Sequence, residues 1–278
     1  MSEVLLEVEE LDVRFPGRGG VTHAVRSASF TLGRERLGIV GESGSGKSTT
    51  GRAILGLIPR PGQVSAKRLS FRGTDLMTLD HAGWLALRGR RISMVMQDPR
   101  YSLNPVVKVG EQILETYRLH HRTTVADARR RALAMLEAVR IRDPDLVYHL
   151  YPHQLSGGMG QRAMIAMMLI AEPDLLIADE PTSALDVTVQ NQVLRILDDL
   201  VSKSGMGLIF ISHNLTVVSS FCDRVLVMYG GRIVEEVRAD MLREARHPYT
   251  RALVASAPAI DRPVAELATV IRDPEWLT

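Results

Sequence analysis

The chain has 278 residues, of which 45% are hydrophobic and 24% are charged, which fits a globular protein with one large domain or one domain with an insertion. A single cysteine, Cys222, excludes a disulfide framework and a cysteine metal cluster, and the net charge of +2 is too small to indicate a nucleic-acid partner. The N-terminus lacks a signal-peptide pattern, and the longest apolar run, 163–171, is far below the ~20 residues of a membrane-spanning helix, so any membrane attachment is expected to go through partners.

The first segment predicts two antiparallel strands. Residues 3–14 alternate between apolar and polar side chains, as a half-buried strand does, and 21–32 predicts a second strand beyond a loop at 16–20. Phe15 stands where an aromatic ring could stack on an adenine, although a core phenylalanine at the end of a strand explains it equally well.

A phosphate-binding loop follows the next strand. The apolar run 36–40 predicts a buried strand, Gly41–Thr49 fits the pattern G-x-x-x-x-G-K-S/T, and 50–57 predicts a helix. Glycines let the backbone fold tightly around an anion, while inward amides and a helix N-terminus attract it. Lys47 is expected to reach the β- and γ-phosphates, and the Ser48 hydroxyl is expected to hold Mg²⁺. The candidate nucleotide-binding residues here are Gly41, Ser43, Gly44, Gly46, Lys47, Ser48 and Thr49.

The middle of the chain changes from strands to helices. After a break at 59–62, the pattern predicts a strand over 64–71, a helix over 79–88 and a short strand over 92–96 that ends at Gln97. From about residue 100 to 170 strand-like runs vanish. Helices are predicted over 109–119 and 125–139, and Leu155-Ser156-Gly157-Gly158 leads into an apolar helix over 163–170.

After the helical stretch the pattern again predicts strands, and the first of them ends in two carboxylates. The buried strand predicted over 175–180 ends in Asp179 and Glu180, at the sheet edge where such folds place ligands. Asp179 there can hold Mg²⁺ through water, and Glu180 can orient or deprotonate an attacking water. A solvated surface pair is the alternative interpretation.

The remaining pattern completes a mostly parallel sheet. A helix is predicted over 190–201 and a buried strand over 208–212, which ends at His213. Strands over 224–228 and 233–237 flank a glycine turn, and the polar stretch from 240 on includes a helical part near 249–255. Strands that alternate with helices favour an α/β fold.

Together these motifs resemble the ATP-binding subunits of ABC transporters. The loop 41–49 resembles the Walker A motif, Gln97 the Q-loop glutamine, and Leu155–Gly158 the signature. Leu175–Asp179 resembles Walker B, with Glu180 at the position of the catalytic glutamate. Ser183-Ala184-Leu185-Asp186 is similar to the D-loop, and His213 to the switch histidine.

The resemblance implies a fold and a division into domains. The fold would be a P-loop NTPase (RecA-like) α/β core with an N-terminal antiparallel β part and an inserted α-helical subdomain. The nucleotide-binding core would comprise residues 1–98 and 171–239, the helical signature subdomain 99–170, and a C-terminal extension 240–278.

The resemblance also implies a mechanism. Two ATPase domains would dimerise head to tail, and each ATP would lie between the Walker A loop of one subunit and Ser156, Gly157 and Gly158 of the other. Asp186 of the D-loop would contribute to the same site. Glu180, His213 and Gln97 would be catalytic, and Ser48, Gln97 and Asp179 would hold the Mg²⁺ of ATP.

A narrower resemblance concerns the cargo. Gln97-Asp98-Pro99, Ser102–Pro105 and the tail His247–Leu253 are similar to the peptide/nickel import subfamily. This implies an importer of short peptides or of nickel and other metal chelates, with a second and different ATPase chain, two permeases and an extracytoplasmic binding protein. The chain would sit peripherally on the cytoplasmic face of the cell membrane. No cysteine follows Cys222, so the iron–sulfur cluster of some relatives is not expected.

Two departures from the family pattern keep other functions open. Gly160 stands where a long polar side chain is common, which allows a weakened signature and a low-activity partner ATPase. Asn214 follows His213 where aspartate is common. An ABC-type ATPase with a role outside transport is the further alternative, since fold does not fix function.

Overall fold

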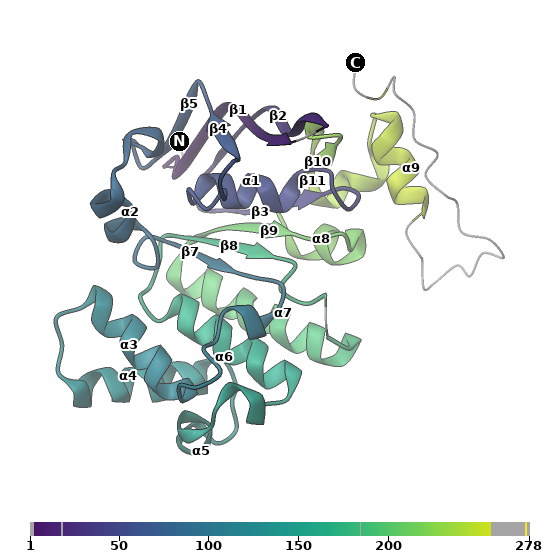
Figure 1. The fold of residues 1–278 in the computed structure, drawn as a ribbon. Coiled ribbons are helices and arrows are strands. Elements are labelled where there is room, and N and C mark those ends of the chain that lie inside the picture. The colour runs from purple at the N-terminus through teal and green to yellow at the C-terminus, as the bar shows by residue number, and fades with distance from the viewer. Residues whose placement is uncertain (1–2, 18, 184, 257–275, 277–278) are drawn as a thin grey trace. The chain divides into compact units, whose positions relative to one another are not determined.

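The computed structural model describes residues 3–17, 19–183, 185–256 and 276. The chain divides into two compact units, one made of residues 1–80 with 207–278 and the other of 81–206. Figure 1 shows the helices and strands with the labels used below. None of the helices in the described part of the chain is long and apolar enough to cross a membrane.

The first unit contains an antiparallel sheet with the order β2-β1-β5-β6, and β4 pairs with β1 beside this path. Its central strand β1 buries Leu6 and Val8, then Leu11 and Val13. The register shifts between Val8 and Leu11, where Glu10 has a φ of 51°, and this bulge keeps all four apolar side chains on the buried face. The strands are β1 (Leu6–Gly17), β2 (Gly20–Leu32), β4 (Gln63–Ser65), β5 (Arg68–Phe71) and β6 (Thr74–Asp75).

A second set of strands in the same unit carries the phosphate loop. The order is β11-β10-β3-β9, in which β3 pairs in parallel with both of its neighbours, while β11 runs antiparallel to β10. Four of the five residues of β3 are buried, as expected of a parallel strand that is covered on both faces. These strands are β3 (Arg36–Val40), β9 (Gly207–Ile211), β10 (Arg224–Tyr229) and β11 (Arg232–Arg238).

Each α-helix of the first unit comes after one of its strands along the chain. The α-helices are α1 (Lys47–Ile54), α8 (Leu215–Phe221) and α9 (Pro248–Ser256), and the 3₁₀ turns are η1 (Leu76–Thr78) and η4 (Ala239–Glu244). The expected C-terminal extension is described as far as residue 256, with residue 276 beyond it; positions 257–275, 277 and 278 lie outside the described residues.

The second unit is mainly helical. Strands β7 (Ile92–Val95) and β8 (Leu175–Asp179) pair in parallel. Helices α3 and α4 pack against each other, and α6 packs against both of them and against α7 (Figure 1). The helices are α2 (His81–Leu87), α3 (Val109–His120), α4 (Val125–Ala138), α5 (Pro144–His149), α6 (Gly157–Leu169) and α7 (Val187–Ser204), with the 3₁₀ turns η2 (Pro99–Tyr101) and η3 (Pro152–Gln154).

The α/β fold class predicted from the sequence is confirmed, while several element boundaries were wrong. The single strand predicted over 64–71 is two strands, β4 and β5, with a turn in which the Lys67 amide donates to the Glu9 carbonyl. The helix predicted from residue 50 begins at Lys47, and the helix predicted from 163 begins at Gly157. Helices α5 and α8 were not predicted.

Candidate functional site

The phosphate loop has a backbone that requires glycine. Gly41, Gly44 and Gly46 have φ values of 148°, 80° and 104°, which L side chains rarely adopt. A Cβ on Gly41 would lie 2.1 Å from the Met228 carbonyl oxygen, and one on Gly46 would lie 2.4 Å from the Ala24 carbonyl oxygen. The pattern of glycines in the sequence therefore reflects both backbone conformation and close packing.

Lys47 lies buried at the start of α1 and its ammonium group faces the loop. Its Nζ donates to the carbonyl oxygens of Gly41 at 2.9 Å and Glu42 at 2.7 Å, and it lies 3.5 Å from Ser45 Oγ. Only 5% of the residue is exposed, so the ammonium is held by loop carbonyls in an environment of low dielectric. An ammonium in this position is suited to bind a polyanion held by the loop.

Helix α1 adds the positive end of its dipole at the same place. Its N-cap is Gly46, whose left-handed backbone turns the chain into the helix without a capping side chain. Backbone amides and a helix N-terminus on a glycine loop form an anion-binding site. Ser48 and Thr49 are half-buried in the first turn, so the structure places these two predicted residues beside Lys47, with Ser43 and Gly44 exposed on the loop.

His213 follows β9 and is exposed. Its neighbour Asn214 has a clear structural role, since its Oδ1 accepts from the Val217 amide and thereby caps α8. The Asn214 amide in turn donates to Ser212 Oγ at 3.0 Å. Asparagine and aspartate are equally good caps, which accounts for the departure from the family pattern at this position.

Phe15 is half-buried at the end of β1. A Cβ on Gly62 would lie 2.7 Å from Phe15 Cε1, so the ring packs closely on the backbone of the 59–62 turn. The ring retains an exposed part and stays a candidate adenine platform.

In the second unit, the two predicted carboxylates stand at the carboxyl end of β8. Asp179 is its last residue and is only 5% exposed, while Glu180 is half-buried. Glu180 has a φ of 48°, a left-handed conformation that is uncommon for a residue with a side chain and that clusters at functional sites. The Ser183 amide and hydroxyl donate to the Glu180 carbonyl oxygen and hold this turn.

The signature residues form the N-terminus of α6. Ser156 is the N-cap, and its Oγ accepts from the Met159 amide at 3.4 Å. Ser156 and Gly157 are exposed, so this helix N-terminus is accessible to a ligand that another molecule holds. A Cβ on Gly158 would lie 2.6 Å from Val189 Cγ1, so the glycine lets α6 approach α7 closely.

The D-loop residue Asp186 caps α7, since its Oδ1 accepts from the Val189 amide at 3.0 Å. Its neighbour Ala184 lies outside the described residues. Gln97 is exposed just after β7.

Gln161 also belongs to this region, although the sequence analysis did not assign it a role. Gln161 is 2% exposed, and its Nε2 donates to the Pro181 carbonyl at 2.5 Å, which ties the signature helix to the turn after Asp179 and Glu180. The only signal in the sequence was the polar type of Gln161 itself, just before the apolar helix predicted over 163–170.

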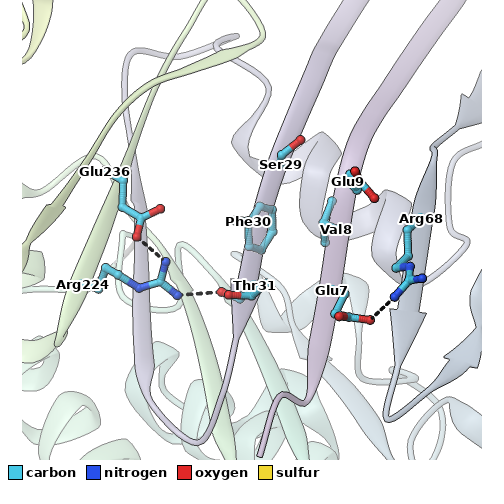
Figure 2. A pocket seen from close by; sticks show the side chains of 9 residues that line it. All are labelled: Glu7, Val8, Glu9, Ser29, Phe30, Thr31, Arg68, Arg224 and Glu236. Atoms are coloured by element: carbon cyan, nitrogen blue, oxygen red, sulfur yellow. Dashed lines mark hydrogen bonds and ion pairs between the residues drawn. The ribbon is translucent and has the colours of Figure 1, made fainter. Parts of the chain in front are cut away.

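A shallow hollow lies elsewhere on the first unit and is lined by none of the predicted site residues (Figure 2). Arg224 bonds Glu236 at 2.6 Å and the Thr31 carbonyl at 2.6 Å across it, and Arg68 lies 3.3 Å from Glu7. Its charges are thus paired within the protein, and the hollow carries no chemistry of its own.

The side chains that could act as ligands decide which metal ion the candidate residues could bind. Within residues 3–17, 19–183, 185–256 and 276, no three His, Cys, Asp or Glu side chains gather as ligands for an ion. Ser48 in the first unit and Asp179 in the second each carry a hard oxygen donor, and Mg²⁺ commonly takes one or two protein oxygens together with phosphates and water. The donor chemistry of each residue therefore suits a magnesium ion that is brought in with a nucleotide.

Comparisons with known proteins agree with these motifs. Residues 25–183 match the family model described as ABC transporter. The chain is 49% identical, over 91% of its length and 78% of the relative, to a dipeptide transport ATP-binding protein of Haemophilus influenzae. It is 47% identical, over 96% of its length and 75% of the relative, to an oligopeptide transport ATP-binding protein of Bacillus subtilis.

A solved structure gives the same result for the fold. A dimeric post-hydrolysis state of an ATP-binding cassette, bound to ADP and Pi, superposes with a TM-score of 0.74 at 25% identity. The match covers 84% of this chain and 99% of the cassette. This chain belongs to the ABC transporter family, as an ATP-binding and ATP-hydrolysing subunit.

Proposed function

We propose that this subunit couples ATP hydrolysis to the import of short peptides through permease partners. The observation that carries the proposal is the 44–49% identity, over at least 91% of the chain, to subunits named for peptide, dipeptide or oligopeptide transport. Those names do not include nickel, so peptides are the better supported of the two cargo classes expected from the sequence.

The first unit binds the triphosphate in this proposal. The amides of the 41–49 loop and the N-terminus of α1 hold the β- and γ-phosphates, with Lys47 as the counter-charge. Phe15 stacks on the adenine, and His213 contacts the γ-phosphate. Magnesium, when bound with ATP, neutralises the charge that develops on the phosphates. Ser48, Asp179 and Gln97 would hold it.

Hydrolysis requires a base and an oriented water. The Glu180 carboxylate accepts a proton from a water whose oxygen bonds the γ-phosphorus, while the bond from that phosphorus to the bridging oxygen of ADP breaks. The left-handed backbone at Glu180 fixes the direction in which this side chain leaves β8.

The second nucleotide-binding surface comes from a partner in the proposal. Ser156, Gly157 and Gly158 form an exposed helix N-terminus that presents a hydroxyl and amides to the γ-phosphate held by another subunit, with Asp186 beside that boundary. The partner is a second ATPase, and the pair acts with two permeases and an extracytoplasmic binding protein at the cytoplasmic face of the membrane. Closure of the dimer would then assemble the site and exclude water.

Uptake by intact cells tests the cargo. Cells that carry this chain or its Lys47→Ala variant are given a labelled dipeptide, or labelled nickel with and without a chelator. Loss of peptide uptake alone in the variant is the expected result. Loss of metal uptake alone would identify a metal-chelate system and refute the peptide assignment. No change in either would refute both cargo classes and favour a role outside transport.

A further inference from the structure

The segment His247-Pro248-Tyr249 begins helix α9 and is held firmly in place. The Glu235 carboxylate on β11 accepts from the Arg246 amide at 2.7 Å and from the His247 amide at 3.2 Å. His247 Nδ1 accepts from the Tyr249 amide at 3.2 Å, and Pro248, which has no amide hydrogen, opens the helix. These contacts fix where the Tyr249 side chain points.

Tyr249 points into the unit and reaches the phosphate loop. The residue is 0% exposed, and its hydroxyl accepts from the Glu42 amide at 3.0 Å. The centroid of its ring lies 4.5 Å from the ring centroid of Tyr229, at the end of β10, and 5.5 Å from that of Trp276. A buried phenol with a packed ring and one oriented hydroxyl is a rigid support, because it has few rotatable bonds.

The peptide that Tyr249 supports is the same one that holds Lys47. The Glu42 amide and the Gly41 carbonyl belong to one planar peptide group, whose N–H and C=O point in opposite directions. Its N–H donates to Tyr249, and its C=O accepts from Lys47 Nζ at 2.9 Å. A continuous chain of two hydrogen bonds thus runs from the phenol through the peptide to the ammonium. In such chains each bond polarises the next.

We propose that Tyr249 is a positioning residue of the nucleotide site, which sets the Gly41–Glu42 peptide and through it the Lys47 ammonium. The C-terminal segment 247–253 is then part of the ATP-binding apparatus. The inference rests on the proposed role of the phosphate loop. Tyr249 does not touch the reacting atoms, so it acts on nucleotide affinity and leaves the chemical step to other residues.

The test is Tyr249→Phe, which keeps the ring and removes the hydroxyl. The dissociation constant for ATP with Mg²⁺, measured by titration calorimetry on the purified chain, is expected to rise about three- to tenfold, the range that one such hydrogen bond supplies. In the assembled transporter the KM for ATP rises by the same factor, while kcat stays within about twofold.

Tyr229→Phe is the matched control. It removes a hydroxyl from the ring that packs against Tyr249, and its dissociation constant is expected to stay within about twofold of the parental value. Lys47→Ala in the same titration checks the loop itself. Weakened binding with Lys47→Ala but unchanged binding with Tyr249→Phe would overturn this inference alone, whereas unchanged binding with Lys47→Ala would refute the proposed role of the loop.

Two further measurements separate positioning from simple structural support. A lower Tm without nucleotide together with unchanged ATP affinity in Tyr249→Phe would mean that the hydroxyl only stabilises the fold, and the inference would fail. If that variant does not fold, hydrogen exchange in the unsubstituted protein decides. Saturating ATP with Mg²⁺ is expected to slow exchange in peptides covering 40–44 and 247–253 together, and unchanged exchange in 247–253 would overturn the proposal.

Discussion

Replacing Gly160 with alanine is expected to stabilise the protein, although the position belongs to the signature helix. Gly160 is the fourth residue of α6, where glycine costs about 1 kcal/mol relative to alanine. A Cβ there would lie 3.5 Å from Pro99 Cγ and 3.8 Å from Pro99 Cβ, which is ordinary contact and adds packing without a clash. The free energy of unfolding should therefore rise by about 1 kcal/mol.

Thermal and urea unfolding of the purified chain, followed by circular dichroism, measures this change, and Tm should rise by about 2–4 °C. Gly158→Ala is the matched control on the same helix. Its Cβ would lie 2.6 Å from Val189 Cγ1, and overpacking of that kind costs about 1–3 kcal/mol, which cancels or exceeds the gain of about 1 kcal/mol over glycine, so the unfolding free energy should not rise. A Gly160→Ala variant that is less stable than the parent, or no more stable than Gly158→Ala, would refute the reasoning.

Two other substitutions, an alkylating reagent and a change of pH test the site and the core. Glu180→Gln should bind ATP normally yet turn it over about 10²- to 10⁴-fold more slowly, the contribution of a general base; turnover at the parental rate would exclude that role. Lys47→Ala should weaken ATP binding itself, and unchanged affinity in a nucleotide titration would contradict the role given to its ammonium. Burial raises the pKa of the Cys222 thiol to about 12 from an ordinary 9.0, so the folded chain should resist alkylation at pH 8; rapid labelling without denaturant would contradict this. Because the unfolded chain loses that proton from about pH 9 and the folded chain does not, this thiol should lower the unfolding free energy as the pH rises from 9 toward 12.

The strands and loops of the site could be predicted because their signals are local. The run 36–40 is fully apolar apart from its first residue and its glycine, and Gly41–Thr49 carries its chemistry in its own residue types. The carboxylates Asp179 and Glu180 follow directly from the end of a buried strand. Patterns of this kind need no information about the rest of the chain.

The boundaries of the helices could not be predicted in the same way. Helix α8 contains Thr216, Val217 and Val218, which disfavour helices, and it forms because Asn214 caps it and Leu215 and Val218 are buried. The strand predicted over 64–71 is interrupted at residues 66–67, and its two parts pair with two separate stretches of β1, residues 12–14 and 6–9, which are far away in the sequence.

The supports of the site were also invisible in the sequence. Gln161 and Tyr249 act through the carbonyl of Pro181 and the amide of Glu42, which are backbone groups that every residue possesses. Because any residue at positions 181 and 42 would offer the same backbone group, the residue types there do not reveal which side chain will contact them. Asp98 is the opposite case of a contact within one short segment: it is half-buried, and hydrogen bonds from Arg100, two residues further on, lower the pKa of its carboxyl.

The loop that binds phosphate is enclosed by segments made much later during protein synthesis. The Gly231 amide donates to the Ser45 carbonyl, and the Met228 carbonyl faces Gly41, while the unit that contains them all joins 1–80 to 207–278. A ribosome that adds about 5–20 residues per second needs roughly 10–40 s to travel from Lys47 to Met228. During that interval the nascent chain carries the complete loop sequence without the segment around Met228 and Gly231 that packs against it. A chain released before these last strands emerge would therefore keep the motif and lack the nucleotide site.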